Sequence, residues 1–269
     1  MKTRVTILVG ITLILILVAC GPGESVPTDT PEPPPPTAPP PTATQIPEPT
    51  STSTPIPPPP TTSPTPFPPF RDDFEQVLED GWTWHQEKRW GWDLHQKPGF
   101  LSVEVALDTN QILLRHAPEG DFEISTRVLL TPYSNFQAAG LLIFQDDGHF
   151  LSFHRGMCDF IEILPEACQG NAIYFNNIDH DVGIPEEGYS LGPQFPTRTA
   201  EISEAYLRIT REGRIYTGYY SDDGGNWMLI GKQESDLMPF YVGLHTFGAE
   251  KYNAYAEFDY FILDALPSN

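Results

Sequence analysis

The stretch AYAEFDYFIL at residues 254–263 alternates its side chains with a period of two. One set consists of Ala254, Ala256, Phe258, Tyr260 and Ile262, and the residues between them are expected on the opposite face. Successive side chains of a β-strand point to opposite faces, so this pattern predicts a strand in a sheet that is buried on one side.

The same period recurs at residues 122–130, where Phe122, Ile124 and Val128 share a face opposite Glu123 and Arg127. No stretch has a convincing helical period, and residues 171–201 predict a long loop. Glycines fall where hairpin turns need positive φ. The sequence therefore predicts an all-β domain, an antiparallel two-sheet β-sandwich of the jelly-roll type. Further predicted strands are 100–105, 138–145, 149–155, 160–164, 205–211, 214–220, 227–232 and 241–246.

The N-terminus has the pattern of an export signal. Lys2 and Arg4 precede an apolar run from Val5 to Ala19 that ends in LVAC at residues 17–20. These four residues resemble the bacterial lipobox, which implies a signal peptide at 1–19 and lipidation of Cys20. An ordinary secretory signal with a chance cysteine is the alternative. We expect a protein anchored to the cell membrane by its lipid and facing outside the cytoplasm.

Residues 20–70 form a segment of different composition, made almost entirely of Pro, Thr, Ser and Ala after Cys20. Such a segment has too little apolar surface to fold, so we expect a disordered stalk. At about 3.1 Å per residue in polyproline II conformation, it could extend on the order of 100 Å. The remaining residues, 71–269, are enough for one globular domain with a sizeable core.

The formal net charge of the chain is -21. Nucleic acid is therefore not an expected partner, because phosphate backbones repel an acidic surface. Anionic lipid is repelled for the same reason, so membrane association is expected to depend on the lipid anchor.

The chain has three cysteines, and lipidation of Cys20 leaves Cys158 and Cys168 as a local pair. An oxidising compartment favours a disulfide between them. Two free thiols or half of a metal site are the alternatives, although neither cysteine belongs to the close CxxC spacing of zinc ligands.

Aromatic residues supply the candidate ligand-binding positions. Indole and phenol rings offer flat surfaces to the apolar C–H faces of sugars. Trp90 stands between charged neighbours and Gly91, which favours exposure, whereas Trp82 and Trp84 have the spacing of core residues. A second candidate set can also be explained as half-buried packing residues. It comprises Tyr133, Gln145, Tyr174 and Tyr219.

The order of several motifs resembles one known superfamily. Asp72-Asp73-Phe74, Trp92-Asp93-Leu94, Ala139-Gly140-Leu141 and the turn at 221–227 follow one another as in concanavalin A-like lectin/glucanase domains. The likeness is greatest to the C-terminal β-sandwich domain of β-xylosidase-type glycoside hydrolases. It implies a two-sheet jelly roll that holds a glycan or polysaccharide, in a module that is usually not catalytic. It also implies a structural calcium ion, for which Asp73 and Asp259 are candidate ligands.

Catalysis has little support in the sequence. The Glu-x-Asp-x-x-Glu pattern of related glucanases is absent, and Asp159 and Glu162 are an odd number of residues apart, so they point to opposite strand faces. We therefore expect no catalytic residues and a carbohydrate-binding lipoprotein. The alternatives are an envelope-associated protein-interaction module without a sugar ligand and, third, a glycoside hydrolase with unfamiliar residues.

Overall fold

The computed structural model describes residues 67–106, 110–159, 162, 168, 170–179, 197–198, 203–248 and 254–267. The predicted signal peptide, Cys20 and the stalk as far as residue 66 lie outside these ranges. No described segment forms a helix that is long and apolar enough to cross a membrane. The described residues form strands and connecting turns, which confirms the predicted all-β class.

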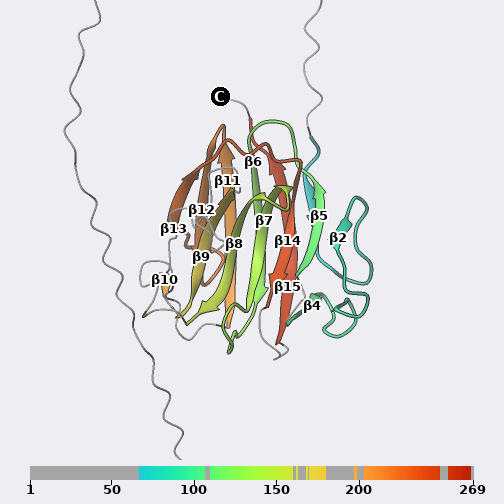
Figure 1. Cartoon of the computed structure of the whole chain (residues 1–269). Helices are drawn as coiled ribbons and strands as arrows, with labels where there is room; N and C mark the ends of the chain where they lie inside the picture. Colours follow the sequence, from blue (N-terminus) through green and yellow to red (C-terminus); the bar gives the residue numbers. More distant parts are fainter. Residues whose placement is uncertain are drawn as a thin grey trace, which may run out of the picture. The chain divides into compact units, whose positions relative to one another are not determined.

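Two antiparallel sheets stack on one another (Figure 1). The larger sheet has eight strands in the order β13-β12-β11-β6-β15-β4-β3, with β1 paired to β15. Its strands are β1 (Phe70–Asp72), β3 (Trp92–Asp93), β4 (Leu101–Val105), β6 (Phe122–Leu129), β11 (Glu204–Glu212), β12 (Ile215–Ser221), β13 (Met228–Glu234) and β15 (Ala254–Ala265).

The second sheet has seven strands in the order β10-β9-β8-β7-β14-β5-β2 (Figure 1). Its strands are β2 (Thr83–Gln86), β5 (Gln111–His116), β7 (Ala138–Asp146), β8 (His149–Cys158), β9 (Gly170–Asp179), β10 (Thr197–Arg198) and β14 (Tyr241–Phe247). Strand neighbours that are distant in sequence, such as β7 and β14, show that the chain crosses repeatedly between the two sheets. This arrangement confirms the predicted sandwich.

The main hydrophobic core lies between the sheets. Ile124 and Leu207 from the larger sheet and Leu141, Phe153 and Leu244 from the smaller one are at most 2% exposed and belong to one cluster. Residues adjacent to these in each strand point away from the core, because side chains alternate along a strand. Each sheet therefore has an inner face in the core and an outer face of distinct composition.

The strand that contains residues 254–263 departs from the predicted alternation. The pairing of β15 with β6 shifts between Phe258 and Tyr260, where a β-bulge adds one residue. Phe261 and Leu263 are consequently fully buried in the core, whereas Tyr260 and Ile262 are only partly buried. The prediction was right as far as Phe258 and wrong beyond it, because one extra residue exchanges the two faces of a strand.

Residues 171–179 form a strand, so the prediction of a loop was wrong for this segment. β9 pairs with β8 over its whole length, from Cys158 opposite Gly170 to His149 opposite Asp179. Its asparagines resemble turn residues, yet Ile173 and Phe175 are fully buried. The predicted strand 160–164 and the remainder of the predicted loop lie largely outside the described residues.

Candidate functional site

The five predicted ligand-binding residues do not converge. Trp90 is 83% exposed in the turn between β2 and β3, and Tyr133 is 55% exposed between β6 and β7. Gln145 lies near the end of β7, where its side-chain oxygen accepts a hydrogen bond from the Met238 amide at 2.9 Å. Tyr219 lies on the outer face of the larger sheet and Tyr174 on that of the smaller sheet. Their ligand roles stay predictions.

Tyr174 belongs to a row of side chains that crosses the outer face of the seven-stranded sheet. His154 of β8 has two cross-strand partners, Tyr174 of β9 and Gly140 of β7. Gly140 is also the cross-strand partner of His245 in β14. His245 pairs with Ile112 of β5. We call this set, Ile112, His245, Gly140, His154 and Tyr174, the histidine row.

The rings of the histidine row are in contact across the glycine. The His154 ring stacks on Tyr174 with centroids 5.8 Å apart, and it meets the His245 ring edge-on at 5.4 Å. Gly140 has no side chain between the two histidines, and a Cβ atom there would lie 2.6 Å from the His154 Cα. Glycine is therefore required at the centre of the row.

Both histidines are neutral at physiological pH. Burial lowers the pKa of His154 well below its ordinary value, and the neighbouring His245 lowers it further. Burial alone lowers the pKa of His245 to about 4. A neutral imidazole has one donor and one acceptor nitrogen, so each ring can exchange hydrogen bonds with hydroxyl groups.

Three polar atoms on this face are buried without a hydrogen-bond partner: His154 Nδ1, His245 Nε2 and Asn176 Oδ1. Asn176 lies in the next row, opposite Ser152 of β8, which pairs with Leu142 of β7. Buried polar groups in proteins are nearly always hydrogen-bonded, so these three atoms need partners that the described residues do not supply.

An apolar cluster adjoins the histidine row on the same face. Leu114, Leu142 and Phe144 are buried there, separate from the main core, with Ile112, Phe150 and Tyr241 packed against them. The ring of His85 lies 4.9 Å from Phe144, and that of His116 lies 4.8 Å from Tyr241. The outer face of this sheet, which we call the histidine face, thus combines flat rings with neutral polar groups.

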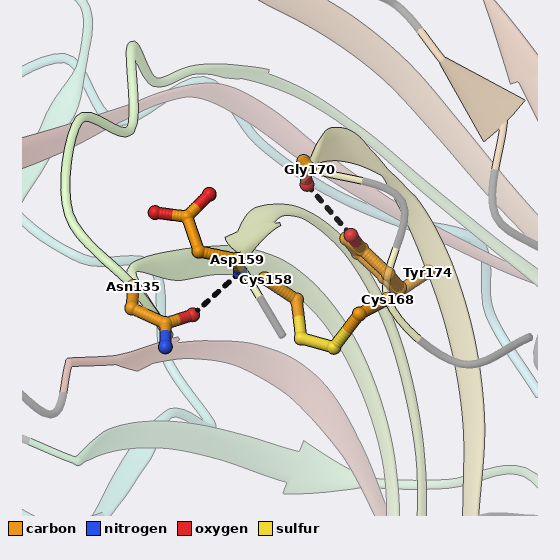
Figure 2. The surroundings of a disulfide bond; sticks show 6 residues. All are labelled: Asn135, Cys158, Asp159, Cys168, Gly170 and Tyr174. Atoms are coloured by element: carbon orange, nitrogen blue, oxygen red, sulfur yellow. Dashed lines mark hydrogen bonds between the residues drawn. A yellow bond between two sulfur atoms is a disulfide. The ribbon is translucent and has the colours of Figure 1, made fainter. Parts of the chain in front are cut away.

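The predicted disulfide between Cys158 and Cys168 is present at one end of this sheet (Figure 2). It joins the end of β8 to the segment before β9, with the two Cα atoms 5.1 Å apart. Beside it, the Tyr174 hydroxyl donates to the Gly170 carbonyl oxygen at 2.6 Å, and the Asp159 amide donates to Asn135 Oδ1 at 2.9 Å (Figure 2). The hydrogen bond to Gly170 orients the Tyr174 side chain within the histidine row.

The two candidate calcium ligands each face an arginine. The Asp73 carboxylate accepts hydrogen bonds from Arg71, and Asp259 accepts one from Arg127 at 3.0 Å. The described residues contain no group of three or more His, Cys, Asp or Glu side chains that could hold a metal ion. Both carboxylates are already neutralised, so they do not fit a calcium site in this arrangement. Calcium binding stays a prediction, which melting with and without chelator would test.

A model of the β-xylosidase C-terminal concanavalin A-like domain matches residues 71–264. The chain belongs to this family. The superfamily and family expected from the order of motifs are therefore confirmed. A search of curated proteins found no match.

Solved structures share the fold of this β-xylosidase C-terminal domain. The xyloglucan PUL GH43B protein of Bacteroides ovatus is 19% identical with a TM-score of 0.59, and the match covers 73% of this chain and 39% of that one. Xylan β-1,4-xylosidase from Bacillus halodurans is 18% identical with a TM-score of 0.58, covering 76% and 40%. The chain thus spans about two fifths of the length of these proteins.

The exoplasmic/lumenal domain of VIP36, in a form bound to Ca²⁺ and Man3GlcNAc, is also similar. It is 12% identical with a TM-score of 0.50, and the match covers 70% of this chain and 85% of that domain. At these identities the likenesses show the fold alone.

Neither histidine of the histidine row was among the site residues predicted from the sequence. His154 and His245 lie in predicted strands, but 90 residues of chain separate them, and β7 lies between their strands. Strand periodicity places a side chain on a face, whereas only the pairing register shows which other strand brings a partner to it. No short motif in the sequence could have found this pair.

Proposed function

We propose that this chain is a carbohydrate-binding protein that uses the histidine face to hold a neutral glycan. The observation that carries this proposal is the grouping of unsatisfied polar atoms of His154, His245 and Asn176 beside aromatic and aliphatic side chains. Sugars present hydroxyl groups and apolar C–H faces together, so they match a surface that offers both kinds of contact.

The charge of the histidine face favours a neutral ligand. The histidine row and the adjoining row of Leu114, Gly243, Leu142, Ser152 and Asn176 contain no Asp, Glu, Lys or Arg. The two histidines stay uncharged at physiological pH. A charged ligand would lose its hydration without gaining an opposite charge here, whereas a neutral sugar exchanges hydrogen bonds with water for hydrogen bonds with the protein.

The similar proteins point to the same ligand class. VIP36 was solved with a bound mannose-containing saccharide, and the two bacterial proteins are named for xyloglucan and xylan. We therefore propose polysaccharides of this kind as the first ligands to test.

We further propose that lipid on Cys20 anchors the protein to the membrane at the cell surface, with residues 20–70 as the stalk. The support is the lipobox-like sequence LVAC and the proline-rich composition that follows it. Radiolabelled palmitate should enter the full chain and not a Cys20→Ala variant. Equal labelling of both would contradict lipidation at this residue.

The glycan proposal is tested by measuring binding of the full chain to xylan, xyloglucan and Man3GlcNAc. His154→Phe and His245→Phe keep a ring but remove the polar nitrogens, so each should weaken binding about fivefold or more, given about 1 kcal/mol for a hydrogen bond. His95→Phe is the matched control, because the His95 side chain is 79% exposed beyond β3.

Three outcomes would count against the proposal. Absence of binding by a chain that melts cooperatively would remove a glycan function. Unchanged binding by the double variant of His154 and His245 would remove the histidine face as the site. Loss of binding in Trp90→Ala alone would place the ligand at the exposed turn between β2 and β3.

A further inference from the structure

The outer face of the eight-stranded sheet carries arginines in two different states. Arg127 of β6 donates to Glu204 at 2.6 Å and to Asp259 at 3.0 Å, so two carboxylates neutralise it. Among the described residues, Arg208 of β11 has one carboxylate nearby, that of Glu123, with 3.9 Å between Arg208 Nε and Glu123 Oε2. That separation is too long for a hydrogen bond. Arg208 is therefore a cation without a matched acceptor.

Two aromatic rings hold the guanidinium of Arg208. Its central carbon lies 4.2 Å from the centroid of the Trp227 ring and 4.8 Å from that of Tyr219. Tyr219 of β12 is the direct cross-strand partner of Arg208. Arginine stacks on aromatic faces through its plane, which leaves the N–H groups at its edge directed away from the rings.

The terminal nitrogens of Arg208 remain available to a ligand. Only its Nε is among the buried nitrogens that lack a hydrogen-bond partner, and no described residue hydrogen-bonds the two terminal nitrogens. The side chain is 25% exposed. A guanidinium edge presents two parallel donors, which matches the two oxygens of a carboxylate.

The turn that precedes β13 ends directly before Trp227. Asp223 accepts hydrogen bonds from the amides of Gly225 and Asn226 at 2.8 and 2.7 Å, and from the Ser221 hydroxyl at 3.0 Å. These bonds hold the pKa of Asp223 well below its usual range. A hydrogen-bonded turn next to Trp227 restricts the local backbone, which lowers the entropy lost when a ligand binds at Arg208.

We propose that Arg208, held between Trp227 and Tyr219, binds the carboxylate of a uronic acid residue on a glycan. That the ligand is a glycan rests on the proposed function. That it carries a carboxylate follows from the guanidinium of Arg208. The net charge of -21 disfavours polyanions and acidic protein partners through long-range repulsion. A mostly neutral polysaccharide with sparse uronate side groups avoids this repulsion and still supplies the acceptor.

The test compares binding of the full chain to glucuronoxylan and to the same polysaccharide after its carboxyl groups are reduced to alcohols. We expect about tenfold tighter binding of the charged form, the size of a charge-assisted hydrogen-bonded pair. Arg208→Met should remove this preference and leave binding of the reduced polysaccharide unchanged. Arg214→Met, which removes an equal charge from a side chain 59% exposed, should retain the preference.

If Arg208→Met does not fold, Arg208→Lys is the variant that tests the proposal. It keeps the charge but loses the planar pair of donors, so the preference should fall at least about threefold. A preference that survives either substitution in a folded chain would overturn the proposal. So would displacement of glucuronoxylan by acetate at the same concentration as by D-glucuronate, because the sugar would then make no contribution.

The two proposals fail separately. Equal binding of charged and reduced glucuronoxylan by the unmodified chain would overturn the role of Arg208, while the histidine face would remain the neutral site. Binding of D-glucuronate that depends on Arg208, with no binding of any neutral glycan, would retain Arg208 and remove the proposed role of the histidine face.

Discussion

The two outer faces of the sandwich differ in how they satisfy their polar groups. On the larger sheet, which we call the arginine face, Arg127 pairs with Glu204 and Asp259, and Arg71 pairs with Asp73. On the histidine face the central rows hold neutral rings and glycines, and three polar atoms lack partners. On the arginine face most charged groups are thus paired with each other, although Arg127 Nε and Arg208 Nε lack a hydrogen-bond partner, whereas the unsatisfied atoms of the histidine face belong to uncharged side chains.

This difference separates polar groups that pair within the fold from polar groups that are candidates for binding a ligand. A buried or half-buried ion pair with short bonds has little left to offer a ligand, because its donors and acceptors are used. Neutral histidines with free nitrogens keep theirs. By the same criterion Arg208 differs from Arg127 on the arginine face, although both lie beside tyrosine rings.

The largest effect is expected at the centre of the histidine row. In Gly140→Val, the added Cβ atom would lie 2.6 Å from the His154 Cα and would also meet the Phe153 carbonyl oxygen. We expect a loss of about 3 kcal/mol or more in the free energy of unfolding, or no folding at all, by denaturant titration. Gly225→Ala is the control, because its nearest neighbour is 3.6 Å from the added Cβ. Equal stability of both variants would contradict the packing of the row.

Acid should weaken the histidine face through its buried imidazoles. The pKa of His245 is about 4 in the folded chain and about 6.5 when unfolded, so the unfolded state binds more protons in between. The contribution of His245 to the free energy of unfolding is therefore complete above about pH 6.5. It is lost as the pH falls towards 4, and the loss is at most about 3 kcal/mol. His245→Phe should flatten this part of the pH profile. An unchanged profile would show that His245 is not buried as described.

The disulfide should contribute slightly less. Cys158→Ser with Cys168→Ser opens a loop with a sequence separation of 10 residues. The chain-entropy model gives a loss of roughly 2–3 kcal/mol, measured by denaturant titration. The disulfide joins the end of β8 to the segment before β9. Its loss should therefore increase hydrogen exchange in β8 and β9 and not in β6 or β15. Uniform acceleration across both sheets would contradict a local role.

The smallest effects should distinguish the two arginines. Arg127→Met leaves Glu204 and Asp259 without their donor, and we expect a loss of about 1–2 kcal/mol. Arg208→Met removes only a long contact to Glu123 and stacking, so a loss below about 1 kcal/mol is expected. Thermal melts of the two variants provide the measurement. A larger loss for Arg208 would mean that its role is structural.

Periodicity predicted the class and most of the strands but failed at two kinds of position. The bulge in β15 exchanged the faces of Tyr260 and Phe261, because it depends on the pairing with β6. The strand β9 was missed because its asparagines resemble turn residues, although β8 supplies hydrogen bonds along its length. β5 was also missed, since Leu113 and Leu114 are both buried and give no alternation.

The predictions for the ligand residues fared differently. Tyr174 and Tyr219 each have a defined place in the structure, on opposite outer faces, while Trp90 and Tyr133 extend into exposed turns. Residue type identified rings that could face a sugar. It could not identify His154 and His245, because their relation depends on a third strand that lies between them.

The sequence by itself determined most of the strands, the turns between them and the family, and it predicted the pairing of two nearby cysteines. Each of these depends on residues close together in the chain or on their order, and local sterics and hydrophobic burial act on that order directly. The tertiary structure alone decided which polar atoms on each outer face lack a hydrogen-bond partner. That outcome depends on strand register and on contacts between residues far apart in sequence, and a shift of one residue would reverse it.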